Sequence, residues 1–318
     1  MHRIPYWFFL FLLSVFAHAQ DMTEIEKFGK NPGNLRLFVH IPKNLPDGNV
    51  PMVVVLHGCN QDAHGMMRLS GWNKLADEQG FIIAYPEQKG TNNVNRCFNW
   101  FYGKDTEMDK GEVASIHQIV EYMINHYAVD VKQVSITGVS AGAVMAVTAA
   151  ALYPRDFSGV ASYAGGPYGS GNIISGVGSM FGWVDRKPWE WARRVRLAND
   201  GYRGSYPKMI VLQGTDDVVC NPKNANELVE QWTGLHELDR DSVRVQEQFQ
   251  DNPKVKRSSW SDAESEKVVL YEFDGLGHAL AVDVGTEKDQ GGTDGLFSVD
   301  IGFHSTYWIA KEFDLIKD

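Results

Sequence analysis

The chain has 318 residues, of which 43% are hydrophobic and 22% are charged, and its formal net charge is −10. This is the composition of a globular protein, and the length allows one large α/β domain or two small ones. The negative charge argues against partners such as nucleic acid or an anionic membrane surface.

The N-terminus has the pattern of a secretion signal. Met1–Arg3 is a short basic start, Tyr6–Phe16 is almost wholly apolar, and Ala17-His18-Ala19 is a small-residue cleavage site. The apolar run is short for a membrane span. A lipid anchor is not supported, because no cysteine lies at the cleavage point. We therefore expect residues 1–19 to be removed and the protein to be secreted, to the extracellular space or the periplasm. An uncleaved membrane anchor is the alternative.

Export changes how the three cysteines are interpreted, because disulfides persist outside the cytoplasm. An odd number allows at most one internal bridge and leaves one thiol over. The residues alone do not choose the pair.

After the signal, expected strands and helices alternate along the chain. Residues 35–41 alternate in polarity up to Pro42, which predicts an edge strand, and residues 51–56 are continuously apolar, which predicts a strand covered on both faces. The remaining strands are expected at 81–85, 134–137, 157–164, 208–212 and 268–273, and helices at 69–78, 112–127 and 141–152. This order predicts one domain over residues 20–318, with a mostly parallel sheet between helices.

Two stretches interrupt the alternation. Residues 165–191 are rich in glycine and aromatic side chains and leave the end of an expected strand, so we interpret them as a lid or pocket wall. An inert surface loop is the alternative, and the glycines do not fit a dinucleotide-binding loop. Residues 236–267 mix charged and apolar side chains, and we expect a solvated excursion there, with a hairpin as one form it could take.

The stretch Gly138-Val139-Ser140-Ala141-Gly142 lies between an expected strand and an expected helix. A serine between two glycines in this context is the nucleophile elbow of α/β-hydrolases, so we expect that fold. The turn lifts the Ser140 hydroxyl above the sheet, and the start of the helix directs N–H groups at developing negative charge. A glycine-flanked serine in an ordinary turn is the alternative.

A serine nucleophile needs a base and an acid that orients the base, in the chain order serine, acid, histidine. The adjacent Asp216 and Asp217 follow strand 208–212, and His278 follows strand 268–273. Either aspartate could instead cap a helix or shape a turn, and His278 could be an ordinary loop histidine. Because the groups occur in the required order, each after a strand, we expect a catalytic triad. Other histidines lie in an expected strand or helix: His40, His117 and His126.

The tetrahedral intermediate of acyl transfer needs two N–H donors. The amide of Ala141 should be one, and the loop His57-Gly58-Cys59-Asn60 should supply the amide of Cys59 as the other. We expect the His57 ring to hydrogen-bond within its own loop. The sequence has no H-E-x-x-H, C-x-x-C or clustered carboxylate pattern, so neither a metal nor another cofactor is expected.

Taken together, these motifs resemble the extracellular polyhydroxybutyrate (PHB/PHA) depolymerases and related esterases of the α/β-hydrolase superfamily. The resemblance runs from about Pro51 to the C-terminus. It rests on residues 57–61 (HGCNQ), 96–101 (RCFNWF), 138–142 (GVSAG), 164–169 (AGGPYG), 214–219 (GTDDVV), 231–234 (QWTG) and 275–278 (GLGH).

The resemblance implies roles for particular residues. The family's acid corresponds to Asp217, and the family's paired cysteines correspond to Cys59 and Cys97, which leaves Cys220 free. Trp100 and Tyr168 are expected at the substrate cleft, although a buried position under the loop is the alternative for Trp100.

The chain also departs from the family pattern. A second cysteine pair is common near the C-terminus of the family, and the corresponding positions here look like Gly291 or Gly292 and His304. Because the chain ends at Asp318, we expect no appended linker and substrate-binding domain, which favours oligomers or amorphous polymer over crystalline polymer.

We therefore expect a secreted serine esterase that cleaves poly- or oligo(3-hydroxybutyrate), with no membrane partner after signal cleavage. A feruloyl or acetyl(xylan) esterase acting on plant polysaccharide is the nearest alternative. An inactive hydrolase fold that serves as a binding module is a second alternative.

Overall fold

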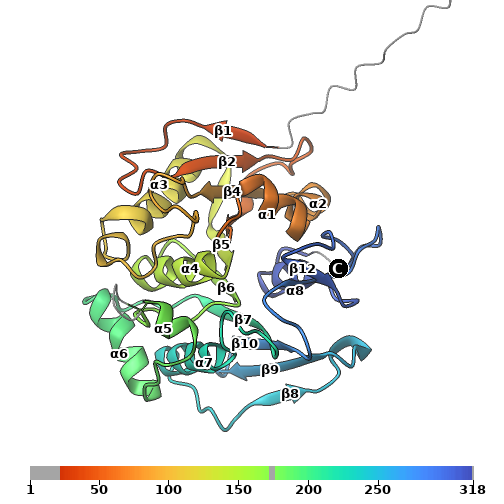
Figure 1. Cartoon of the computed structure of the whole chain (residues 1–318). Helices are drawn as coiled ribbons and strands as arrows, with labels where there is room; N and C mark the ends of the chain where they lie inside the picture. The colour runs from red at the N-terminus through yellow and green to blue at the C-terminus, as the bar shows by residue number, and fades with distance from the viewer. Residues whose placement is uncertain (1–21, 172–175, 317–318) are drawn as a thin grey trace, which may run out of the picture.

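A computed structural model describes residues 22–171 and 176–316, without the side chain of residue 177. The expected signal, residues 1–19, lies outside the described residues. Ten of the described strands form one sheet in the order β1-β2-β4-β3-β5-β6-β7-β10-β9-β8 (Figure 1). Their bounds are β1 Thr23–Ile25, β2 Arg36–His40, β3 Val50–Leu56, β4 Ile82–Glu87, β5 Val129–Val139, β6 Gly159–Tyr163, β7 Lys208–Gly214, β8 Arg244–Gln246, β9 Val255–Ser261 and β10 Glu266–Phe273.

The centre of the sheet is parallel and its two edges are antiparallel. Strands β4, β3, β5, β6, β7 and β10 pair in parallel, so the loops after them emerge at one edge of the sheet. The outer pairs, β1·β2, β2·β4, β10·β9 and β9·β8, are antiparallel. The expected mostly parallel central sheet is therefore confirmed, and it brings the three candidate catalytic loops to one edge.

Helices cover both faces of the sheet (Figure 1). One apolar core lies beneath α3, α4, α6 and α7, and a second lies beneath α1, α2 and α8. The helices are α1 Ala63–Ser70, α2 Trp72–Gln79, α3 Gly111–His126, α4 Ala141–Leu152, α5 Gly176–Met180, α6 Pro188–Ala198, α7 Lys223–Leu235 and α8 Ser305–Glu312, with single 3₁₀ turns at Gly103–Asp105 (η1) and Phe249–Asp251 (η2). A short parallel pair, β11 Leu280–Val282 with β12 Ser298–Asp300, packs beside α8.

Three expectations for local structure were wrong. β2 is not an edge strand, because the three residues of β1 pair outside it and are too few to show a pattern. The single helix expected at 69–78 is two helices, because Gly71 adopts a left-handed conformation (φ 75°) that ends α1. Residues 236–267 are more than a solvated excursion, because they add β8 and β9 to the sheet and bury Trp260. The hairpin considered for this stretch is present as β9·β10.

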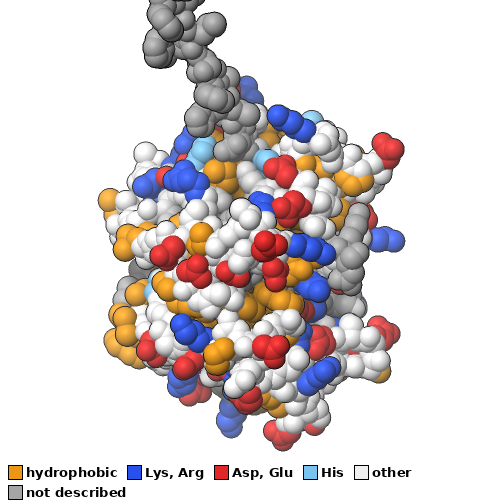
Figure 2. All heavy atoms as spheres, turned by 90° about the vertical axis from the view of Figure 1, so that its right-hand side faces the viewer, with side chains coloured by type: hydrophobic (Ala, Val, Ile, Leu, Met, Phe, Trp, Pro, Cys, Tyr) orange, Lys and Arg blue, Asp and Glu red, His pale blue; other side chains and the backbone are white. Residues whose placement is uncertain are grey.

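The surface carries charges of both signs. On the face shown in Figure 2, acidic and basic side chains are interspersed, with hydrophobic side chains exposed between them. Among residues 22–171 and 176–316, no helix is both long enough and apolar enough to cross a membrane.

Candidate active site

Ser140 occupies a strained turn between β5 and α4. Its backbone has φ 57° and ψ −121°, a combination that side-chain-bearing residues rarely adopt. The backbone N–H of Ser140 donates to the carbonyl of Tyr163 at the end of β6 (2.9 Å), which ties the turn to the neighbouring strand. A strained turn that is held in this way by the neighbouring strand presents its side chain at the sheet edge, as the motif predicts.

The two glycines of the motif are required by close backbone packing. A Cβ on Gly138 would overlap the backbone of Gly142, and a Cβ on Gly142 would overlap the carbonyl oxygen of His57. The turn therefore has no room for a side chain two residues before or two residues after Ser140, and the second glycine also lets the His57 loop approach the helix start.

Asp217 and His278 form a hydrogen-bonded pair. His278 Nδ1 lies 2.7 Å from Asp217 Oδ2, and the Asp217 side chain is fully buried. Because a carboxylate can only accept, Nδ1 carries a proton, and in the neutral ring Nε2 of His278 keeps its lone pair. Of the two adjacent acids, Asp217 is the one that contacts His278, whereas the carboxylate of Asp216 contacts Thr215.

The surroundings of Asp217 keep it ionised. Burial opposes ionisation, but the hydrogen bonds from His278 and from the amides of Cys220 and Val219 (each 2.8 Å) outweigh it, so the pKa of Asp217 is lowered. Gln213 Nε2 adds a further bond to Oδ2 (3.2 Å). An ionised carboxylate keeps the proton of a neighbouring histidine on Nδ1, which is the tautomer in which Nε2 can act as a base.

Backbone contacts hold the serine, aspartate and histidine loops together. Asp216 N–H donates to the carbonyl of Leu276 (3.0 Å), which joins the acid loop to the histidine loop. The buried Tyr163 joins the Ser140 turn to β11, directly after the histidine loop, because its carbonyl accepts from Ser140 and its hydroxyl accepts from the amide of Ala281 (2.7 Å).

The Ser140 hydroxyl makes no hydrogen bond within the described part of the chain. The structure therefore joins Asp217 to His278 directly, and brings Ser140 to the same sheet edge two strands from the acid. Catalytic hydrogen bonds are often long before substrate binds.

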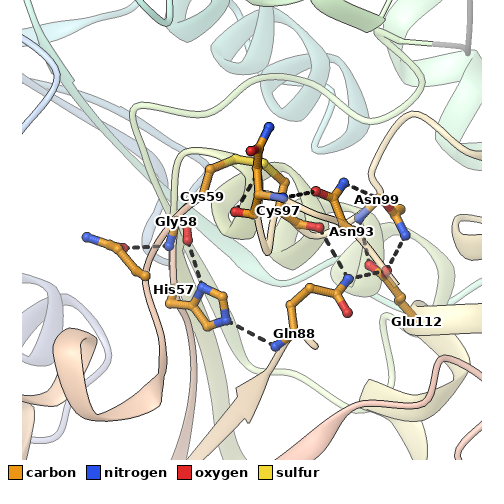
Figure 3. Close-up of a disulfide and its surroundings, with 10 residues drawn as sticks. His57, Gly58, Cys59, Gln88, Asn93, Cys97, Asn99 and Glu112 are labelled. Atoms are coloured by element: carbon orange, nitrogen blue, oxygen red, sulfur yellow. Dashed lines mark hydrogen bonds between the residues drawn. A yellow bond between two sulfur atoms is a disulfide. The ribbon is translucent and has the colours of Figure 1, made fainter. Parts of the chain in front are cut away.

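The loop after β3 lies against Ser140. Hydrogen bonds and a disulfide hold this loop in place (Figure 3). A Cβ on Gly58 would lie 3.5 Å from Ser140 Cβ. Gly58 N–H donates to Gln61 Oε1 (2.7 Å), and its carbonyl accepts from Nδ1 of the buried His57 (2.7 Å), as expected for a histidine bonded within its own loop. Burial lowers the pKa of His57, so its ring is neutral. In the described residues, the amides of Cys59 and Ala141 donate to no other group, which leaves both available.

Cys59 and Cys97 form the disulfide that the resemblance implied, and Cys220 is a free, buried thiol. The disulfide fastens the loop after β3 to the loop that carries Trp100 (Figure 3). Cys220 Sγ donates to the carbonyl of Gly165 (3.0 Å), so it connects the acid loop to the start of the 165–191 segment.

Trp100 and Tyr168 lie at different depths. The Trp100 indole is only 7% exposed, and a Cβ on Gly171 would overlap it, so Trp100 lies under the 165–171 loop. Tyr168 is held by the side chain of Gln231, which bonds both its N–H (2.8 Å) and its carbonyl (3.0 Å). Tyr168 lines a cavity of about 530 Å³ together with side chains of α6, such as Trp189.

Some residues of the site region carry no signal in the sequence. Glu112, Gln88 and Asn99 form a buried hydrogen-bonded cluster behind the His57 loop (Figure 3). Glu112 falls at the start of an expected amphipathic helix, where an acid is ordinarily a solvated first-turn residue. In the sequence, Tyr163 likewise cannot be distinguished from the other apolar residues of a buried strand. Within residues 22–171 and 176–316, no cluster of ligating side chains suits a metal ion.

The sheet carries a strained serine turn and an aspartate–histidine pair at one edge, and together with the comparisons that follow this defines a carboxylic-ester hydrolase with the α/β-hydrolase fold. The comparison with known families agrees, because the family described as "Esterase PHB depolymerase" matches residues 36–247. The chain belongs to this family.

Relatives place the chain among esterases. It is 39% identical over 297 residues to poly(3-hydroxyalkanoate) depolymerase C of Paucimonas lemoignei, covering 93% of this chain and 70% of that protein. It is 29% identical over 300 residues to feruloyl esterase B of Talaromyces stipitatus, covering 92% and 81%. Among solved structures, the acetyl xylan esterase from Aspergillus awamori is similar with a TM-score of 0.75 and 26% identity, covering 81% and 93%.

Proposed function

We propose that the chain is an exported, single-domain serine esterase that hydrolyses poly- or oligo(3-hydroxybutyrate). Similarity to the depolymerase of Paucimonas lemoignei supports the polyester as substrate. The presence of a disulfide supports export after removal of residues 1–19. The observation that carries the proposed chemistry is the Asp217–His278 pair at the sheet edge that also presents Ser140 in its strained turn.

In the proposed mechanism, Ser140 Oγ attacks the ester carbonyl and His278 Nε2 accepts its proton. Asp217 holds the imidazole in the required tautomer and stabilises its positive charge. The amides of Cys59 and Ala141 donate to the oxyanion of the tetrahedral intermediate. His278 then protonates the leaving alkoxide, and water hydrolyses the acyl-enzyme by the same steps in reverse order.

The neighbouring segments supply the proposed substrate cleft. Tyr168, at the wall of its cavity, contacts the substrate chain, and Trp100 acts at the cleft by supporting the 165–171 loop from beneath. The described parts of the glycine- and aromatic-rich segment, residues 165–171 and 176–191, form the proposed pocket wall. Asn221 N–H and Asn224 Nδ2 both bond the carbonyl of Met180 (2.8 and 2.9 Å), which fixes α5 beside the acid loop.

Replacing Ser140 with alanine tests the chemistry. Turnover of p-nitrophenyl butyrate should fall by several orders of magnitude while the protein stays folded. Near-normal turnover in Ser140→Ala would contradict the mechanism.

A second candidate is an esterase acting on acylated plant polysaccharide, favoured by the similarity to feruloyl and acetylxylan esterases. Initial rates on hydroxybutyrate oligomers, ethyl ferulate and acetylated xylan separate the two, because the proposed function predicts the highest kcat/KM on the oligomers.

A further inference from the structure

Glu112 is a buried acid that the proposed triad does not use. It lies in the first turn of α3, is 1% exposed, and forms no ion pair with a lysine or arginine of the described chain. Burial raises the pKa of Glu112 to about 8, the amide of Asn99 opposes the rise, and the nearby Asp105 adds to it. A buried acid without a cation is costly to a fold. The hydrogen bonds of Glu112 identify the segments that it holds in place.

All three partners of Glu112 donate to it. The amide N–H and the side-chain Nδ2 of Asn99 each lie 2.7 Å from its carboxyl oxygens, and Gln88 Nε2 donates to the oxygen that also accepts from Nδ2 (Figure 3). Glu112 therefore fixes two segments at once, namely the end of β4 at Gln88 and the loop at Asn99.

The Gln88 branch leads to the oxyanion loop. The backbone N–H of Gln88 donates to His57 Nε2 (3.1 Å), which requires the ring proton to be on Nδ1. That Nδ1–H donates to the carbonyl of Gly58 (2.7 Å). A trans peptide holds its C=O and N–H on opposite sides, so a Gly58 carbonyl drawn toward His57 directs the Cys59 N–H away from it.

The Asn99 branch reaches the same peptide from the other side. Asn99 is two residues from Cys97, whose disulfide holds Cys59, and Asn93 Nδ2 donates to Asn99 Oδ1 (2.9 Å). Gln88 Nε2 also donates to the carbonyl of Cys97 (3.2 Å), so the two branches are joined. Both ends of the Gly58–Cys59 peptide thus depend on residues that Glu112 anchors (Figure 3).

We propose that Glu112 is a positioning residue for the oxyanion hole, which orients the amide of Cys59 through Gln88 and His57 on one side and through Asn99 and the disulfide on the other. This inference rests on the proposed function, because it assigns the Cys59 amide to the oxyanion. Glu112 itself contacts no substrate atom in this proposal and acts only through its hydrogen-bond partners.

The test is Glu112→Gln, assayed above pH 8, where Glu112 is ionised and accepts on both oxygens, whereas glutamine of nearly the same shape presents an NH₂ group to one of the N–H donors. A displaced oxyanion donor weakens the transition state more than substrate binding. On p-nitrophenyl butyrate we expect kcat to fall by about tenfold or more while KM stays within about twofold. The largely buried Glu312 on α8 is the matched control, since it bonds Tyr271 Oη (2.7 Å) on the opposite face of the sheet. Glu312→Gln should lower the melting temperature without lowering kcat.

A second variant keeps the test informative if Glu112→Gln folds poorly. Gln88→Met removes the side-chain bonds to Glu112 and Cys97, and those that Oε1 accepts from Lys89 N–H and Asn92 Nδ2. It keeps the backbone N–H that donates to His57, and it should also lower kcat. Combined with Glu112→Gln, its effect on kcat should be less than multiplicative, because both act through one cluster. Folded Glu112→Gln and Gln88→Met enzymes with wild-type kcat, or a kcat loss equal to that of Glu312→Gln, would overturn the inference. If Ser140→Ala remained active, the proposed function would fail instead, whatever the result at Glu112.

Discussion

Removing the Cys59–Cys97 disulfide should cost both stability and catalysis. The bridge closes a loop with a sequence separation of 38 residues. In the chain-entropy treatment, a loop of that length restricts the unfolded chain enough to stabilise the fold by about 4 kcal/mol. Because Cys59 also supplies the proposed oxyanion amide, Cys59→Ser/Cys97→Ser should lower kcat in addition.

The assay is guanidinium denaturation followed by circular dichroism, with kcat on p-nitrophenyl butyrate measured where the variant is folded. The wild type with reductant should shift toward the variant, whereas reductant should leave the variant unchanged, because Cys220 is already a buried free thiol. A free energy of unfolding within about 1 kcal/mol of the oxidised wild type, together with an unchanged kcat, would refute the reasoning.

Three further predictions follow from particular contacts. Asp217→Asn should lower kcat by about 10³–10⁴-fold, because the amide favours the wrong tautomer of His278, whereas Asp216→Asn should stay near wild type; equal losses in the two variants would contradict the assignment of the acid. Gly142→Ala should abolish activity or folding, because its Cβ meets the His57 carbonyl, while Gly90→Ala, with open space around it, should be neutral in melting temperature and rate; an active Gly142→Ala enzyme would show that the two segments can separate freely. Burial lowers the pKa of His304 from 6.5 to about 4. The contribution of the neutral ring to the free energy of unfolding, about 3 kcal/mol, is therefore complete above pH 6.5 and is lost as the pH falls toward 4. His304→Gln should remove this pH dependence from the stability–pH curve measured by denaturation.

The central sheet could be predicted from the sequence because its strands contain short runs rich in apolar or β-branched residues, several of which lead into glycine- or proline-containing turns. The candidate catalytic loops could be placed for a related reason. Ser140, Asp217 and His278 each follow such a run, and parallel strands bring the loops after them to one edge. What the pattern could not supply is the distance between them, which depends on how the loop after β10 turns back toward β7.

Elements with few residues or mixed polarity could not be predicted. β1 has only three residues, and its pairing with β2 depends on where the chain returns in space. Arg257, in a stretch that looks solvated, is buried because Glu312 from the far end of the chain binds it (2.8 Å). Glu112 was missed because a helix periodicity shows which face is apolar and not which polar side chain is enclosed by loops from elsewhere.

Gly291 and His304, the positions that correspond to the family's second disulfide, pack against each other in the structure. Gly291 lies against the His304 ring so closely that a Cβ on Gly291 would overlap it, and His304 Nε2 bonds the carbonyl of Ser70 (2.9 Å). The two positions are neighbours, as the resemblance suggested, and a buried histidine packed on glycine stands there instead of a bridge.

The proposed mechanism requires Ser140 to be an activated nucleophile, and a fluorophosphonate probe measures this directly. The wild-type enzyme should form one covalent adduct, which mass spectrometry should map to the peptide containing Ser140, and His278→Ala should label far more slowly. Ser140→Ala should not label at all. A wild-type enzyme that does not react, or an adduct that persists in Ser140→Ala, would contradict the central claim.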